Sequence, residues 1–335
     1  MNIIAETLST VRLGTPAGYR NLAVFPLFSE PDRVPGYVTL DEALGRKTAR
    51  VTEVSESGQV PELLFENSDA EKVLLVDGEE LVGAKQNRIL NVTILVGAGQ
   101  KVAVPVSCVE QGRWHWKSRH FESSKQSLFA RARAKKMAQV NRSLRSGASY
   151  RADQGEIWND VEEKLVAFCS RAPTLAMSDA FEERGAEIDE YVQALRPAGH
   201  QVGAVFAVDG KVLGLELFDS AATFAKLMEK FLRSYAIDAI ENGARDAKAP
   251  VEEVVQKFLE DMKAAVIERF PAVGEGEQLR LENDTLAGGA LLADDRLVHV
   301  CVLCTPKAEG LPGGESDEGT SDIPPFLRQR RRRTE

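Results

Sequence analysis

The period of the hydrophobic pattern changes near residue 120, and this change constrains the fold more than any other feature. Before it, short apolar segments alternate with turns that contain Gly and Asp, at residues 22 to 28, 48 to 54, 72 to 78, 88 to 96 and 101 to 110. Short runs of this composition between turn residues are typical of β-strands. Residues 1 to 120 are therefore predicted to form a β-rich lobe.

The middle of the chain, residues 121 to 197, is predicted to be helical. Apolar residues recur there at spacings of three and four, first at Ala130, Ala134, Met137, Val140 and Leu144, and then at Ile157, Val161, Leu165 and Phe168. This spacing places them on one face of a helix. A third helix is predicted near 179 to 195, and the Arg196-Pro197 pair ends it, because proline disfavours the helical conformation of its predecessor.

Residues 198 to 305 are predicted to form an α+β lobe. Two apolar strands, 202 to 208 and 211 to 217, flank Asp209-Gly210, a dipeptide that favours a tight β-hairpin turn. Two helices should follow, one with the stripe Phe224, Leu227, Phe231 and Tyr235 and one after Pro250. Strands near 277 to 283, 286 to 292 and 296 to 304 complete the lobe. The predicted fold class is α+β.

Composition narrows the setting of the protein. The chain has 335 residues and a net charge of −9, which argues against a nucleic-acid partner. It has only four cysteines, no apolar run long enough for a membrane span, and no signal-like start, so we expect a reduced, cytoplasmic protein that does not enter a membrane. Residues 306 to 335, rich in Gly, Pro, Ser and charge, are predicted to be a disordered tail with a basic end at Arg330 to Arg333.

The candidate functional site lies between Gly78 and Trp116. Polar residues crowd GEELVGAKQNRI (78 to 89) between two apolar segments, and VPVSCVEQGRWHW (104 to 116) follows. If the second segment is a regular strand, Cys108 and Glu110 share a face. A carboxylate near a guanidinium and amide donors suits a hydroxylated or phosphorylated ligand. The predicted catalytic residues are Glu79, Glu110 and Cys108, and the predicted ligand-binding residues are Glu80, Gln86, Asn87, Arg88, Arg113 and Trp114.

Other interpretations of the same residues remain open. Glu110 can pair with Arg88 or Arg113 for structural reasons, with Cys108 as a small core residue. A cysteine nucleophile needs His115 or His120 folded back beside it. Cys108, Glu110, His115 and His120 are also residue types that bind metals, but zinc sites usually show tight paired spacings, which these four residues lack. No metal site is therefore predicted. In HVCVLC, Cys301 and Cys304 are interpreted as buried strand thiols.

The stretch from Lys117 to Arg145 is locally basic, with nine Lys and Arg and a single acid, Glu122. It can form a solvated helix face or a rim that attracts anions. A protein partner could bind this basic helix or the basic tail.

Four stretches resemble one family: VDGEELVGAKQNRILN, VPVSCVEQGRW, DQGEIW (153 to 158) and GKVLGLELFDS (210 to 220). Over about residues 1 to 305 the chain is similar to the ARG and Rhodanese-Phosphatase-superfamily-associated protein domain family. The residues that match are Glu79, Glu80, Gly83, Gln86, Asn87, Arg88, Cys108, Glu110, Arg113, Trp114, Gln154 and Trp158. The family is named for its association with ADP-ribosylglycohydrolase-type and rhodanese-phosphatase proteins. The resemblance therefore implies a setting of ADP-ribose, NAD or related phosphate-ester metabolism.

The leading hypothesis is binding of an ADP-ribose-like or nucleotide-derived phosphate compound; if the protein is an enzyme, it is a hydrolase of such compounds. Glu110 or Glu79 would then be the general base or hydroxyl anchor, with Arg88 and Arg113 as anion clamps. Two alternatives stand beside it. One is a non-catalytic ligand sensor or adaptor, and the other is a structural protein-interaction module whose polar motif maintains the fold.

Overall fold

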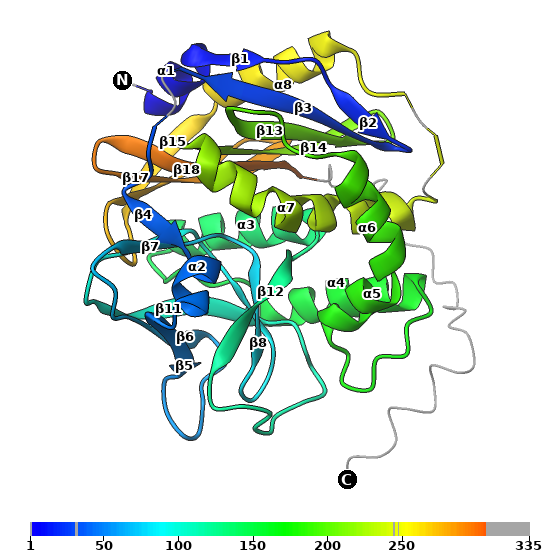
Figure 1. Ribbon diagram of the computed structural model, residues 1–335. Coiled ribbons are helices and arrows are strands. Elements are labelled where there is room, and N and C mark those ends of the chain that lie inside the picture. Colours follow the sequence, from blue (N-terminus) through cyan, green and yellow to red (C-terminus); the bar gives the residue numbers. More distant parts are fainter. Residues whose placement is uncertain (1, 31–32, 244, 247, 306–335) are drawn as a thin grey trace, which may run out of the picture. The chain divides into compact units, whose positions relative to one another are not determined.

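The computed structural model describes residues 2–30, 33–243, 245–246 and 248–305 (Figure 1). They belong to a compact unit that ends at Thr305 and contain eight helices and eighteen strands, so the fold is α+β as predicted. The predicted tail, 306 to 335, lies outside the described residues. In the described part of the chain, no helix is both long enough and apolar enough to cross a membrane.

The largest sheet has nine antiparallel strands. In spatial order they are β1 (Val11–Leu13), β3 (Leu22–Ser29), β13 (Gln201–Val208), β14 (Lys211–Phe218), β18 (Arg296–Cys304), β17 (Leu286–Ala293), β16 (Glu277–Glu282) and β15 (Val266–Pro271), with β2 (Ala17–Tyr19) also paired to β3. The predicted hairpin joins β13 to β14. Asp209 and Gly210 both have positive φ, 49° and 75°, as its tight turn requires.

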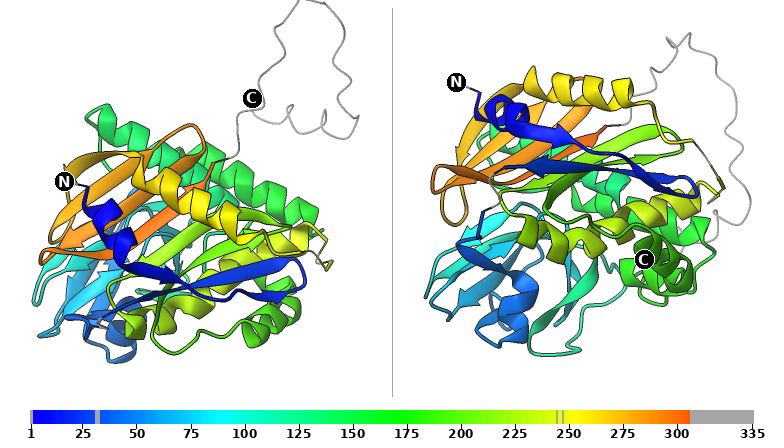
Figure 2. Two further views of the ribbon diagram at one scale, coloured as in Figure 1. Left: turned by 90° about the horizontal axis from the view of Figure 1, so that it is seen from above. Right: turned by 45° about the horizontal axis from the view of Figure 1, so that its top comes forward.

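Helices cover both faces of this sheet. Helices α1 (Ile3–Thr10) and α8 (Glu252–Lys263) lie on one face, and α3 (Ala130–Arg145) and α7 (Ala221–Glu241) lie on the other (Figures 1 and 2). Each helix turns its periodic apolar residues toward the strands, as α8 does with Phe258 and Met262. Two apolar clusters, one on each side of the sheet, result.

Two smaller sheets carry the candidate site. One contains β10 (Ile94–Val96), β7 (Lys72–Leu75) and β4 (Tyr37–Thr39); the other contains β12 (Phe121–Ser127), β8 (Glu79–Gly83), β9 (Arg88–Leu90), β11 (Lys101–Cys108), β6 (Glu62–Asn67) and β5 (Ala49–Glu53). Together with α2 (Leu40–Gly45) they enclose a third apolar cluster. The polar stretch 78 to 89 thus forms β8, a turn at residues 84–87 and the start of β9.

The helical segment is present, with one correction at its start. Helices α4 (Gln154–Ala167), α5 (Met177–Glu183) and α6 (Gly185–Ala194) follow α3, so the third predicted helix is split near Arg184. Residues 121–127, expected at the start of the helical segment, instead form strand β12. This strand pairs with β8 with an irregular register, a tertiary contact that its own polar sequence does not indicate.

The lobes predicted from the sequence are not separate compact units. Strand β3, from the first lobe, pairs with β13 from the last lobe over nearly its whole length. Strands β1, β2 and β3 therefore share a sheet with the C-terminal lobe, and the described residues cluster as one unit. Pairing between segments about 180 positions apart leaves no local mark in the sequence from which a boundary could be predicted.

Candidate functional site

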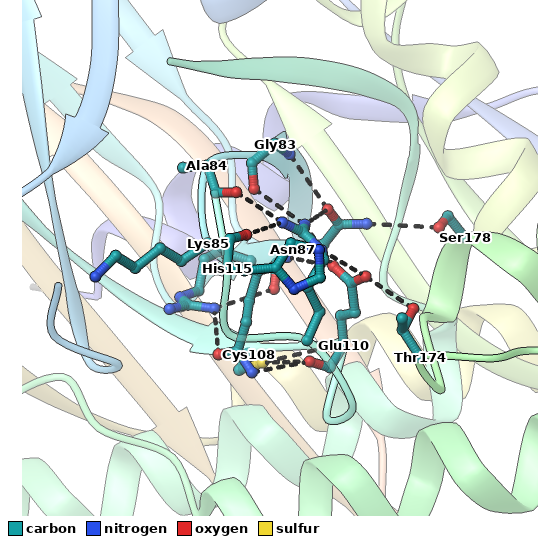
Figure 3. Close-up of polar contacts among 12 residues, drawn as sticks. Gly83, Ala84, Lys85, Asn87, Cys108, Glu110, His115, Thr174 and Ser178 are labelled. Atoms are coloured by element: carbon teal, nitrogen blue, oxygen red, sulfur yellow. Dashed lines mark hydrogen bonds and ion pairs between the residues drawn. The ribbon is translucent and has the colours of Figure 1, made fainter. Parts of the chain in front are cut away.

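The carboxylate of Glu110 is saturated with hydrogen bonds from its own protein. Arg113 donates from Nε to Oε1 over 2.8 Å and from Nη2 to Oε2 over 2.6 Å, in the parallel fork geometry that guanidinium and carboxylate favour. The backbone N–H of Asn87 donates to Oε2 over 2.9 Å, and Thr174 Oγ1 donates to Oε1 over 2.8 Å (Figure 3). Burial raises the pKa of Glu110, but Arg113 and these other donors outweigh it and lower the pKa below its ordinary value.

The same arginine closes the turn between β8 and β9. Nη1 of Arg113 donates to the carbonyl of Ala84 over 2.6 Å, and Nη2 donates to that of Gly83 over 3.1 Å. Gln86 Nε2 donates to the carbonyl of Glu110 over 3.0 Å. The fold therefore brings Gln86, Asn87, Glu110 and Arg113 together as the sequence suggested, but their polar groups bond to one another. Their predicted catalytic and ligand-binding roles stay predictions, and these contacts favour the structural interpretation.

Arg88 and Cys108 lie directly opposite each other on β9 and β11. Arg88 is fully buried and donates from Nη1 to Gln86 Oε1 over 2.9 Å, while its Nε and Nη2 make no hydrogen bond within the described residues. Burial lowers the pKa of Arg88, and Cys108 and Glu53 oppose that shift. Glu53 lies on β5 and was not among the residues predicted from the sequence. Burial also raises the pKa of the Cys108 thiol, the reverse of what an activated nucleophile requires.

Trp114 and Trp116 lie at the surface on either side of a lysine. The Nζ atom of Lys85 is 5.4 Å from the ring centre of Trp114 and 5.1 Å from that of Trp116. It also donates to the carbonyls of Glu56 and Ser57. The face that each ring turns to Lys85 therefore already contacts a cation of the protein, through an attraction that an aromatic quadrupole favours.

Glu80 is the most unusual of the predicted residues. Its side chain is fully buried in β8, and neither carboxylate oxygen makes a hydrogen bond within the described residues. Burial raises the pKa of Glu80 to about 7, although the polar side chains of Ser124 and Gln126 nearby act in the opposite direction. The carboxyl group therefore changes its charge near neutral pH.

Glu79 points to a different partner, which the sequence did not identify. Its Oε2 accepts from the backbone N–H of Val76 over 2.7 Å, and its Oε1 accepts from Lys230 Nζ over 2.6 Å. Lys230 lies on α7 and also donates to Asp41 over 2.7 Å and to Ser123 over 2.9 Å. Burial lowers the pKa of Lys230, but the two carboxylates outweigh it and raise the pKa above its ordinary value.

Lys230 lines a cavity, which we call the α2–β12 cavity. Its volume is about 750 Å³, and it lies between α2, β5, β12 and α7. The residues that line it are Asp41, Leu44, Gly45, Lys47, Thr48, Ala49, Arg50, Glu66, Ser68, His120, Phe121, Glu122, Ser123, Ser124, Lys125, Lys226, Glu229 and Lys230. None of the predicted site residues lines it, and Glu79 reaches it only through Lys230.

Three cations of this cavity have no counter-ion. Lys47, Arg50 and Lys125 are all exposed and make no ion pair with any described residue. The two other cations are paired, Lys226 to Glu42 and Lys230 to Asp41 and Glu79. The sequence signal that could have indicated the cavity is Lys230 itself, a lysine between Leu227 and Phe231 on the apolar stripe of a helix.

Most of the positive charge on helix α3 is paired with carboxylates of the protein. Of its six Lys and Arg residues, five form ion pairs: Arg131 with Glu241, Arg133 with Glu216 and Asp77, Lys135 with Asp160, Lys136 with Asp77, and Arg145 with Glu268 and Glu282. Cys301 is buried beside Arg133, as predicted for this strand, and Cys304 is half-buried. The surface of this helix therefore offers little unpaired charge to a partner.

Comparison with known proteins gives one result. No curated protein and no solved structure matches the chain. The family model of the ARG and Rhodanese-Phosphatase-superfamily-associated Protein domain matches residues 10–303, which include every motif and both cavity-lining helices α2 and α7. The chain belongs to this family.

Proposed function

We propose that the α2–β12 cavity binds a phosphate-containing small molecule derived from a nucleotide, of the ADP-ribose type. The observation that carries the proposal is the set Lys47, Arg50 and Lys125, three cations without counter-ions around one cavity. The cavity volume of about 750 Å³ is within the range of small-molecule sites. A phosphate between these side chains would supply the charge that they lack.

Different lining residues can bind different parts of such a ligand. Arg50 can bind two phosphate oxygens with one guanidinium fork, and Lys47 and Lys125 act as point charges on longer stems. Glu122 offers a carboxylate that can accept hydrogen bonds from ribose hydroxyls. An anionic ligand with hydroxyl groups fits this combination better than an apolar ligand does.

In this proposal the family motif supports the cavity without touching the ligand. Glu79 fixes the Nζ atom of Lys230 at the cavity surface. The Glu110–Arg113 pair holds the turn that precedes β9 and so orients the sheet to which β8 and β12 belong. Such supporting contacts keep a binding group within the narrow tolerance that recognition needs.

A hydrolytic form of the proposal needs a base inside the cavity. A base must approach the attacking water within about 2.6–3.2 Å. Of the four lining carboxylates, Asp41, Glu66 and Glu229 pair with Lys230, Lys101 and Arg233, whereas Glu122 has no ion pair within the described residues. In that form Glu122 takes the proton of the water, and Glu122→Gln abolishes turnover while ligand binding remains.

The structural-module alternative has its own support. Four protein donors occupy the two oxygens of the Glu110 carboxylate, which is the pattern expected of a group that maintains the fold. The adaptor alternative, with a partner on the basic helix, has less support because α3 is largely paired internally. The two roles of the motif, fold maintenance and cavity support, are compatible.

The test is a thermal-shift panel on the full chain at low salt. ADP-ribose, ADP, ribose 5-phosphate and pyrophosphate are compared with uncharged ribose, using wild type and the variant Lys47→Gln/Arg50→Gln/Lys125→Gln. A ligand at 100 times its Kd stabilises the folded state by about 2.7 kcal/mol. We expect a shift with the phosphorylated compounds that the triple variant loses.

A second triple variant controls for net charge. Lys257, Lys263 and Arg269 lie outside the α2–β12 cavity, on α8 and β15, so their replacement by Gln removes the same charge elsewhere. This variant should keep the ligand shift. A flat panel, or equal loss of the shift in both triple variants, would contradict the proposal.

A further inference from the structure

A second cavity, independent of the first, lies where α1 meets the end of β14 and the start of β18. We call it the α1–β18 cavity; its volume is about 340 Å³. The residues that line it are Ile3, Glu6, Thr7, Thr10, Val11, Ser29, Arg33, Val202, Leu217, Phe218, Asp219, Asp295, Arg296 and Leu297. It shares no lining residue with the α2–β12 cavity, so its interpretation does not depend on the function proposed above.

One buried carboxylate of this cavity is only half satisfied. The side chain of Asp219 is 4% exposed. Tyr37 Oη donates to its Oδ1 over 2.5 Å, and Thr223 Oγ1 in turn donates to Tyr37 Oη over 3.3 Å. Its Oδ2 has no hydrogen bond within the described residues, and Arg296 Nη1 lies 3.5 Å away. A buried acceptor of this kind is costly unless a donor reaches it.

Two guanidinium groups face the same space. Arg296 pairs with Asp219 at that long distance, and Arg33 makes no ion pair with any described residue. Burial raises the pKa of Asp219. Arg296 and Arg33 are both close enough to oppose this shift, but they do not reverse it. The cavity therefore holds two planar cation forks beside a carboxylate that lacks one donor.

The other side of the cavity is apolar. Val202, Leu217 and Leu297 are buried strand residues on the α1 side of the sheet that line it, together with Ile3 of α1. These side chains provide an apolar surface for a small aliphatic group.

We propose that the α1–β18 cavity binds a free α-amino acid with an aliphatic side chain. The ligand carboxylate accepts from Arg33 and Arg296, the ammonium group donates to Oδ2 of Asp219, and the side chain lies on the apolar strand residues. A simple carboxylate would leave Asp219 without its donor, and a simple amine would place a third cation beside two guanidiniums. Only a zwitterion satisfies both groups at once.

Titration calorimetry tests this assignment with three compounds that share a branched alkyl chain and differ in their charged groups. L-leucine carries both charges, 4-methylpentanoate carries only the carboxylate, and 3-methylbutylamine carries only the ammonium group. We expect saturable binding of L-leucine, with each single-charge compound at least tenfold weaker. Equal binding of L-leucine and 4-methylpentanoate would overturn the assignment, as would the absence of saturable binding of L-leucine to folded wild type.

Variants place the binding at this cavity. Asp219→Asn and Arg296→Gln should each weaken L-leucine binding at least tenfold, while Arg269→Gln, on the sheet edge outside the cavity, leaves it unchanged. A thermal melt of each variant confirms that it is folded. The Lys47→Gln/Arg50→Gln/Lys125→Gln variant should bind L-leucine normally, so failure here and failure of the phosphate proposal are separately visible. Unaltered affinity in both Asp219→Asn and Arg296→Gln would refute the site.

Discussion

The Nζ atom of Lys230 lies 2.6 Å from Oε1 of Glu79, so an ion pair joins the family-motif strand β8 to the lining of the α2–β12 cavity. Both side chains are almost completely buried. Their relationship gives the motif a physical connection to the proposed ligand site.

Replacing Lys230 by Met should destabilise the protein strongly. Burial already raises the pKa of Glu79, and the variant removes the cation that opposes this shift; breaking a buried pair from one side costs about 3–5 kcal/mol. Urea unfolding measures the loss, and Lys226→Met, which removes a more exposed cation of the same helix, is the matched control with a small expected effect. In the Glu79→Gln/Lys230→Met double variant the loss should be smaller than the sum of the single losses. Additive single effects would show that the pair is not coupled.

Replacing Glu110 by Gln should also lower the free energy of unfolding, by about 3 kcal/mol, because Arg113 then stays buried without a counter-charge. Chemical denaturation measures the change. Glu56→Gln, at an exposed ion pair with Arg119, should change stability far less. Since the pKa of Glu110 is lowered on folding, its contribution is present above the unfolded pKa and lost as pH falls through the folded pKa. A wild-type protein no more acid-sensitive than the variant would contradict this interpretation.

Glu80 predicts the opposite pH dependence. Its folded pKa of about 7 is above the ordinary value of 4.5, so the neutral carboxyl group favours folding below pH 4.5 and this contribution is lost as pH rises through 7. Glu80→Gln, which is neutral at every pH, should therefore be more stable than wild type at pH 8, by on the order of 3 kcal/mol. The difference should shrink toward pH 5. Parallel stability profiles for the two proteins between pH 5 and 8 would show that Glu80 does not titrate in this range.

Gly83 tests the geometry of the motif turn. It has φ of +125°, and a Cβ atom there would lie 2.6 Å from Ser118 Oγ and 2.8 Å from the carbonyl oxygen of His120. Gly83→Ala should therefore lower the free energy of unfolding by about 1–3 kcal/mol, through backbone strain and the steric clash. Gly185→Ala is the control, because Gly185 begins helix α6 with ordinary φ and open space around it. It should be neutral or slightly stabilising, and equal melting temperatures for the two variants would count against the turn geometry.

The sequence predicts local structure well where one segment is sufficient to define it. The β13–β14 hairpin and helices α3, α7 and α8 follow from turn chemistry and apolar periodicity, and the structure contains them. The pairing of β3 with β13 and the strand β12 depend on segments distant in sequence, which no local pattern encodes. The same reason explains the site. The motif residues Asn87, Glu110 and Arg113 are found together, whereas Lys230 joins Asp41 and Glu79 only through the tertiary fold.

The central claim is that the motif supports the fold while the cavity cations bind the ligand. Titration calorimetry with ADP-ribose distinguishes these two roles. It compares wild type, Lys125→Gln and Glu110→Gln at a temperature at which all three are folded. The account predicts that Lys125→Gln binds at least about tenfold more weakly with an unchanged melting temperature, and that Glu110→Gln keeps most of its affinity with a lowered melting temperature. Full affinity in Lys125→Gln together with abolished binding in folded Glu110→Gln would contradict the account and place the ligand at the motif itself.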